Sequence, residues 1–100
     1  MKRIILAMLV AFAFASTSHA DETPSLVTVL TAADPQTQLM SMVLTMQALK
    51  QGSKAHVLLC GPAGDIALKD APASATAPQK PKGMSPQGLM KNVIANGGSV

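Results

Sequence analysis

Apolar and polar positions along the chain alternate between short β-rich runs and longer helical stripes. Residues 26–30 and 55–60 are mostly Val, Leu and Ala, which is typical of strands covered on both faces. Between them, Leu39, Met42 and Met46 recur at helical spacing and predict a well-buried helix. A strand, helix and strand of this length predict a right-handed crossover between parallel strands.

Start and stop signals bound two helices. Asp34 followed by Pro35 is typical of an N-cap and first helical residue, and Gly52 is suited to the C-terminal end. Residues 85–98 repeat this arrangement, with a Ser-Pro start, an apolar stripe and an Asn-Gly-Gly end. Residues 99–100 are then expected to enter a third strand. We attribute this repeated arrangement to the start and end signals that helices of α/β proteins share, rather than to a gene duplication.

The segment between the second predicted strand and the second predicted helix, residues 61–84, is poorer in apolar residues. The Gly-Pro-Ala-Gly sequence at 61–64 predicts a turn, and 65–69 predict a short helix. Residues 70–83 are rich in Ala, Pro, Ser and Lys, which indicates a flexible or extended surface loop.

The first twenty residues have the organisation of an export signal. Lys2 and Arg3 precede an unbroken apolar stretch at 4–15, and Ser-His-Ala at 18–20 provides small residues for cleavage after Ala20. Twelve helical residues reach roughly 18 Å, whereas the hydrocarbon core of a bilayer is about 30 Å thick. We therefore expect a signal peptide at 1–20, no stable membrane span, and a periplasmic or secreted product.

Removal of this signal changes the composition. Phe12 and Phe14 are lost with it, so the mature chain has no aromatic residue. Its six lysines and five acidic residues leave a net charge of +1, and the precursor pI of about 9.4 says little about partners. Without a basic stripe or stacking platforms, nucleic-acid binding is not expected.

The mature 80 residues are enough for one domain. A chain of this size buries only about 60 % of its unfolded surface. Cys60 has no cysteine to pair with, so no internal disulfide adds stability. We therefore expect the domain to need a homo-oligomer or related partner subunit, or sequence beyond Val100.

Several runs together resemble the DsrE/DsrF-like family. They are LVTVLT at 26–31 followed by Asp34-Pro35, MQALKQG at 46–52, HVLLCGPAG at 56–64, and MSPQGLM at 84–90 leading to NGGSV at 96–100. The resemblance spans residues 26–100, so 21–100 is expected to be a partial DsrE/DsrF-like α/β domain.

This resemblance implies a three-layer α/β fold with a largely parallel sheet of βαβ units, usually assembled into oligomers. In this chain that fold is expected to be incomplete after the start of the third strand, as in a truncated product or fragment. Some family members carry sulfur as a cysteine persulfide. Their carrier cysteine follows a later strand, so Cys60 does not correspond to it.

Cys60 is nevertheless the main candidate for chemistry, because it ends a strand where ligands of parallel α/β sheets bind. A thiol there attacks a persulfide or disulfide if its pKa is lowered. Alternatively it packs as a small hydrophobe or pairs with an external cysteine. Its apolar strand favours packing, and we expect a mostly buried, slowly reacting thiol.

The other candidates each have a structural explanation that we prefer. His56 lies four strand positions from Cys60, about 13 Å away, so the two are not expected to pair. Asp34 is a better helix cap than an acid or base. The turn at 61–64 lacks the G-x-G-x-x-G and P-loop patterns.

Two further groups of residues, the methionines of the first helix and the lysines near residue 80, also have structural explanations. The sulfur atoms of Met40, Met42 and Met46 would suit a soft metal, but their helical spacing favours core filling. Lys80-Pro81-Lys82 is expected to be a solvated loop. We therefore expect no cofactor and no metal site, and leave open whether the protein is an enzyme.

The functional expectation from the resemblance is an accessory sulfur-handling role that uses thiol or persulfide chemistry. The alternatives are a non-catalytic module that binds a small molecule or a protein, and a truncated remnant without independent function.

Overall fold

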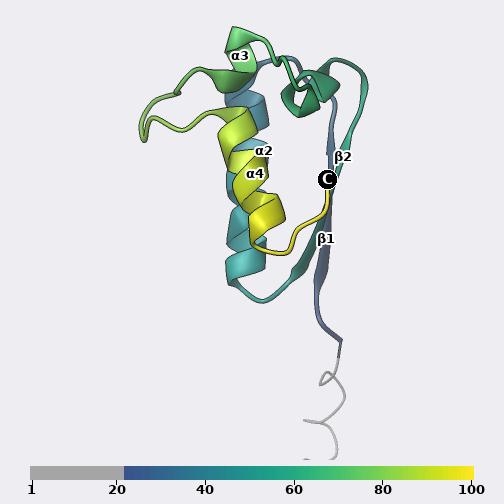
Figure 1. Ribbon diagram of the computed structural model, residues 1–100. Helices are drawn as coiled ribbons and strands as arrows, with labels where there is room; N and C mark the ends of the chain where they lie inside the picture. The colour runs from purple at the N-terminus through teal and green to yellow at the C-terminus, as the bar shows by residue number, and fades with distance from the viewer. Residues whose placement is uncertain (1–21) are drawn as a thin grey trace, which may run out of the picture.

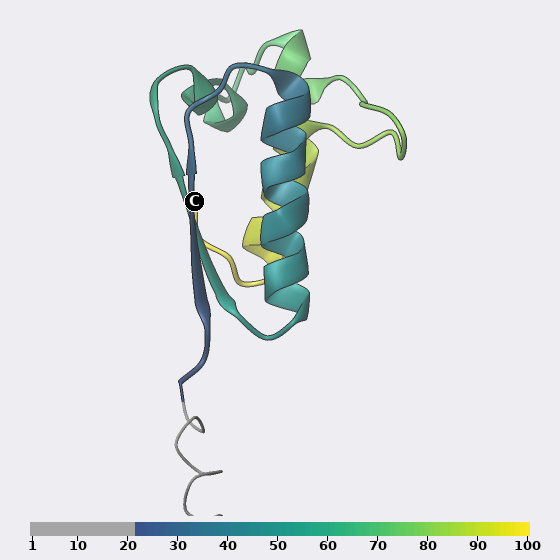
Figure 2. The ribbon, with the colours of Figure 1, turned by 180° about the vertical axis from the view of Figure 1, so that it is seen from behind.

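The computed structural model describes residues 22–100 and places a parallel sheet on one side and two helices on the other (Figures 1 and 2). The elements in chain order are β1 (Ser25–Leu30), α2 (Pro35–Lys50), β2 (Lys54–Leu59), the 3-10 helix η1 (Gly61–Ala67), α3 (Ala73–Thr76) and α4 (Pro86–Ala95). The predicted signal peptide, with its cleavage site after Ala20, lies outside the described residues. Within residues 22–100, no helix has both the length and the apolar character needed to cross a membrane.

The sheet is parallel, as the alternating pattern predicts. β1 pairs with β2 in register from Ser25 opposite Lys54 to Leu30 opposite Leu59. After α4 the chain returns to the other side of β2, where the Ser99 N–H donates to the carbonyl of Ala55 at 3.0 Å. The α/β class and the parallel pairing are therefore confirmed, and Ser99 forms a single parallel bridge with His56 where a third strand was expected to begin.

Each long helix begins at the residue that the sequence indicates. The Asp34 carboxylate accepts a hydrogen bond from the backbone N–H of Thr37 at 2.8 Å, and Pro35 is the first residue of α2. At α4, the hydroxyl of Ser85 accepts one from the N–H of Gly88 at 3.0 Å. These side chains satisfy N–H groups that have no partner inside the helix.

Both helices end in a Schellman motif. Gly52 and Gly97 adopt positive φ angles of 88° and 95°, which favour glycine. After α4, the N–H of Gly98 donates to the carbonyl of Val93 at 2.9 Å, and that of Gly97 donates to Ile94 at 3.1 Å. This reversal directs the chain from α4 back to β2, where Ser99 joins the sheet.

The connection between β2 and α4 is more ordered than the composition suggests. The expected turn at 61–64 and the helix expected at 65–69 are replaced by η1, which begins at Gly61. Pro62 lies in the first turn of η1, where the fixed φ of proline suits a helix, and the side chain of Ile66 in η1 is fully buried. The expectation of an extended loop at 70–83 was wrong at α3, because Ala75 is also fully buried against the core.

The core lies between the sheet and the helices. It contains the inward-facing residues of β1 and β2 together with Met42, Leu89 and Val93. On the opposite side of the sheet, Val27 and Leu58 are 63 % and 56 % exposed. The strands were expected to be covered on both faces, but helices cover one face only within residues 22–100.

Candidate functional site

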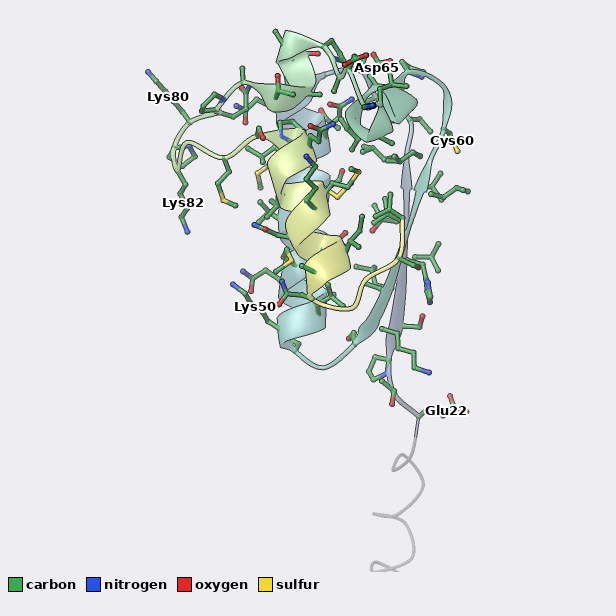
Figure 3. All side chains as sticks on the ribbon, in the orientation of Figure 1. Glu22, Lys50, Cys60, Asp65, Lys80 and Lys82 are labelled. Carbon is green, nitrogen blue, oxygen red and sulfur yellow. The ribbon has the colours of Figure 1, made fainter. Side chains whose placement is uncertain are left out.

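Cys60 lies at the carboxyl end of β2, at the sheet edge where ligands of parallel α/β folds bind. Its backbone is extended, and its N–H donates to the carbonyl of Leu30 at 2.9 Å. The side chain is half-buried and points away from the helix layer (Figure 3). This partial burial agrees with the expected packing role, although alternation along β2 puts Cys60 on the same side as exposed Leu58 and not with buried Val57. The slow reaction of the thiol stays a prediction.

His56 is hydrogen-bonded to Ser99 and not to the thiol of Cys60. Its ring Nδ1 shares a hydrogen bond with the hydroxyl of Ser99, and the side chain is exposed on the open face of the sheet. Within residues 22–100, no group of three His, Cys, Asp or Glu side chains is arranged to hold a metal ion.

Asp34 acts as a cap. Hydrogen bonds from the backbone N–H and then the hydroxyl of Thr37 lower the pKa of its carboxyl below the usual 3.8. Nearby, the amide nitrogen of Gln38 donates to the carbonyl of Ala32 at 2.9 Å, which fixes the loop between β1 and α2. The polar groups at this edge therefore serve the start of α2.

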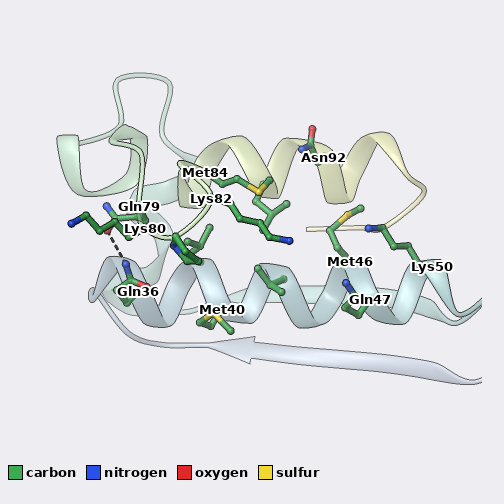
Figure 4. Close-up of a pocket in the computed structure, with 14 residues that line it drawn as sticks. Gln36, Met40, Met46, Gln47, Lys50, Gln79, Lys80, Lys82, Met84 and Asn92 are labelled. Carbon is green, nitrogen blue, oxygen red and sulfur yellow. Dashed lines mark hydrogen bonds between the residues drawn. The ribbon is translucent and has the colours of Figure 1, made fainter.

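A second site lies on the helix layer, away from Cys60. A groove of about 470 Å³ runs between α2, α4 and the segment 79–84 (Figure 4). One stripe of α2, from Gln36 in its first turn to Lys50 in its last, forms one wall. α4 contributes Leu89 and Asn92.

The floor of the groove is apolar. Leu39 and Leu89 are buried beneath it, and Val43, Met46 and Met84 are half-buried and pack on the core. The floor is therefore the outer surface of the hydrophobic core and is held in place by it. The exposed side chain of Met40 extends the apolar surface along α2.

The segment 79–84 is pinned at its base. The N–H of Gln79 donates to the carbonyl of Met84 at 2.8 Å, and the N–H of Gly83 donates to the carbonyl of Gln79 at 2.8 Å. The side chain of Gln36 donates to that of Gln79 at 3.1 Å, which joins α2 to this segment at one end of the groove (Figure 4).

The charges around the groove are of one sign. Lys50, Lys80 and Lys82 line it, and the described lining residues include no carboxylate. Figure 4 shows Lys82 extended along the groove and Lys50 pointing toward it from the end of α2, while Lys80 points away. Two ammonium groups therefore face an apolar floor.

Sequence reasoning missed this groove. The expectation that Met40, Met42 and Met46 fill the core is right for Met42, which is fully buried, and wrong for Met40, which is exposed. Met40 and Met46 line the groove. Lys80, Pro81 and Lys82 are exposed, as expected, but the place of Lys82 beside α2 was not predicted. The second apolar stripe on α2 was the sequence feature that could have indicated the groove. It indicates a groove only when the segment 79–84 is known to lie beside it.

No family model, curated protein sequence or solved structure matches the chain. The class of the protein therefore rests on its own fold and surface: a small parallel α/β protein with an apolar, lysine-rimmed groove on its helix layer.

Proposed function

We propose that this protein is a non-catalytic binding module, and that a small molecule occupies the groove between α2, α4 and the segment 79–84. One observation carries the proposal: the groove has an apolar floor, polar groups only at its rim, and a volume of about 470 Å³. Binding pockets for small molecules typically measure about 300–1,000 Å³ and have this distribution of polar and apolar groups.

The groove needs little rearrangement to bind. Its floor is continuous with the core, and its lid-like segment is tied down by backbone hydrogen bonds at Gln79 and Gly83. A preformed site loses little conformational entropy on binding. A ligand with an apolar surface would release water from Met40, Val43 and Met46, which supplies the driving force.

A neutral apolar dye tests this proposal. Nile red fluorescence should rise on addition of the protein, and Asn92→Trp should abolish the rise because the indole fills the groove from its exposed rim. Lys91→Trp is the matched control, since Lys91 is the exposed neighbour and does not line the groove. An equal rise with both variants would place the dye elsewhere, such as on the open sheet face, and would refute the proposal.

We also propose that the protein is an exported DsrE/DsrF-like protein of the three-layer α/β type, in which a further layer covers the open face of the sheet. The exposure of Val27 and Leu58 supports this three-layer arrangement, because an apolar sheet face requires cover. The cover would come from a homo-oligomer, a related subunit or further chain.

Accessory sulfur handling at Cys60 is a second candidate, favoured by the place of this partly buried thiol at the carboxyl end of β2. The Cys60 thiolate would attack the outer sulfur of a low-molecular-weight persulfide. A sulfur–sulfur bond forms on Cys60, the donor's sulfur–sulfur bond breaks, and the donor leaves as a thiolate.

Mass spectrometry after incubation with glutathione persulfide tests this step. The folded protein should gain one sulfur atom, and Cys60→Ser should gain none. If the thiol gains sulfur only after denaturation, it serves packing and the second candidate is wrong.

A further inference from the structure

We infer that the ligand of the groove is an elongated anionic amphiphile of the fatty-acid class, with its carboxylate held by Lys82 and Lys50 and its alkyl chain lying along α2. This inference rests on the proposed function and adds the chemical class and orientation of the ligand.

The shape of the groove favours a chain-like ligand. Its apolar surface on α2 extends from Met40 to Met46, about 9 Å along the helix at 1.5 Å per residue. Met84 and Leu89 form the facing side. Three of these side chains are methionines, whose flexible thioethers adapt to an alkyl chain without a unique shape.

The charges favour an acidic head. The ammonium groups of Lys82 and Lys50 approach from opposite walls, and the lining residues that the structure describes contain no carboxylate to pair with them (Figure 4). Their alkyl stems can cover the hydrocarbon of the ligand while their charged ends contact its head. The amide of Gln47 lies on the same stretch of the groove and can donate a hydrogen bond to the head (Figure 4).

The opposite end favours the tail. There the hydrogen bond between Gln36 and Gln79 uses one donor and one acceptor on each other, and Lys80 points away (Figure 4). A cationic amphiphile would be repelled by Lys50 and Lys82. A bilayer surface is flat, whereas this floor is recessed between two helices and a pinned segment, so a single free molecule fits better.

The methionines provide both reporters and internal controls. In protein isolated after export and labelled with ¹³C at the methionine methyl groups, dodecanoate below its micellar concentration should shift the signals of Met40, Met46 and Met84. The signals of Met42 and Met90 should stay in place, because both side chains are buried in the core.

Charge variants test the head. Dodecanoate should bind about fivefold more tightly than dodecanol, as expected for two exposed charge contacts, and dodecyltrimethylammonium should bind more weakly than either. The double variant Lys50→Gln/Lys82→Gln should lower the affinity for dodecanoate to that for dodecanol. Lys91→Gln, which removes an exposed charge outside the groove, should leave the affinity for dodecanoate unchanged.

The alternative outcomes separate the two proposals. Equal binding of dodecanol and dodecanoate at the groove methionines would overturn the anionic class and leave the binding module intact. Absence of any shift at Met40, Met46 and Met84 with all three compounds would overturn both. Shifts produced only by anionic phospholipid vesicles would overturn the inference and indicate that the protein binds a membrane surface. Equal shifts at Met42 and Met90 would also overturn it, because they would show that the compound loosens the core as a detergent does.

Discussion

Asp34 stabilises the first turn of α2 through a carboxylate that accepts hydrogen bonds from the N–H and the hydroxyl of Thr37. These bonds lower its pKa in the folded state below the usual 3.8, so the ionised form is bound more favourably in the folded chain. The contribution of Asp34 to the free energy of unfolding is therefore fully present above the pKa that its carboxyl has in the unfolded chain. It is lost as the pH falls through the lower pKa of the folded state.

We expect Asp34→Ala to lower the urea midpoint at neutral pH, and this loss to shrink below about pH 4, where unfolded aspartates become protonated. Asp34→Asn is the control, because its amide oxygen still caps the helix but does not titrate. Urea unfolding followed by circular dichroism across this pH range gives the comparison. If the loss of stability caused by Asp34→Ala grew as the pH was lowered, the ionised Asp34 carboxylate would not be the group that stabilises α2.

Gly98 is required by close packing where the chain leaves α4. A Cβ at this position would lie 2.5 Å from a side-chain carbon of Val93, which is fully buried, and 3.0 Å from the carbonyl oxygen of that residue. We expect Gly98→Ala to reduce the free energy of unfolding by about 1–3 kcal/mol, the usual range for overpacking. Gly64→Ala is the control, since no atom lies within 4 Å of its added Cβ. Chemical denaturation measures the loss for both variants. Equal losses for Gly98→Ala and Gly64→Ala would show that the structure accommodates the contact with Val93 at little cost.

Single residues also show what a sequence can and cannot reveal. Asp34 and Gly97 were predictable because their roles depend on neighbours within a few positions. The side of the sheet on which Cys60 lies was not predictable, because it depends on which face the helices cover. The place of Lys82 beside the groove depends on a segment that packs against a helix more than 30 residues earlier.

Among the elements, α2 connects the core and the groove. Met42 is fully buried on its inner side, and Leu44, two positions later, is 63 % exposed. We expect Met42→Ala to reduce the free energy of unfolding by about 2–5 kcal/mol, through lost transfer energy and a cavity. The exposed Leu44→Ala should stay within about 0.5 kcal/mol of the parent protein. Urea denaturation measures both, and similar losses would mean that α2 is rotated relative to the structure.

The elements that the sequence predicted best are those with strong local signals at both ends. α2 and α4 begin at capping residues followed by proline and end at glycines with positive φ, so their bounds were close to the prediction. η1 and α3 lack side-chain caps and depend on the burial of Ile66 and Ala75 against distant elements. Tertiary packing, rather than local propensity, decides such short helices.

At the scale of the whole molecule, the groove and the open sheet face lie on opposite sides of the protein. The helices separate them, with the segment 79–84 on the outside and the sheet on the other side (Figure 2). Neither surface was predictable from one segment, because each is formed by what packs beside it. A partner can therefore cover the sheet without closing the groove.

We expect the protein to associate through the open sheet face. Val29 and Leu58 are paired across β1 and β2, both are more than half exposed, and Val27 continues the apolar surface. Lys54 is the one charged side chain on this face of the two strands, at their amino end. Because an isologous dimer brings the same surface against itself, a face with so little charge is suited to contact with a second copy.

Sedimentation equilibrium with matched variants checks this expectation. Val29→Lys and Leu58→Lys should each weaken association more than tenfold, because each replaces roughly 1.5–3 kcal/mol of apolar burial by like charges facing one another across the symmetric contact. Ile94→Lys is the control, since Ile94 is also about half exposed (51 %) but lies on α4, away from the sheet. A parent protein that stays monomeric at high concentration, or dissociation caused by Ile94→Lys alone, would rule out the sheet face as the contact between copies.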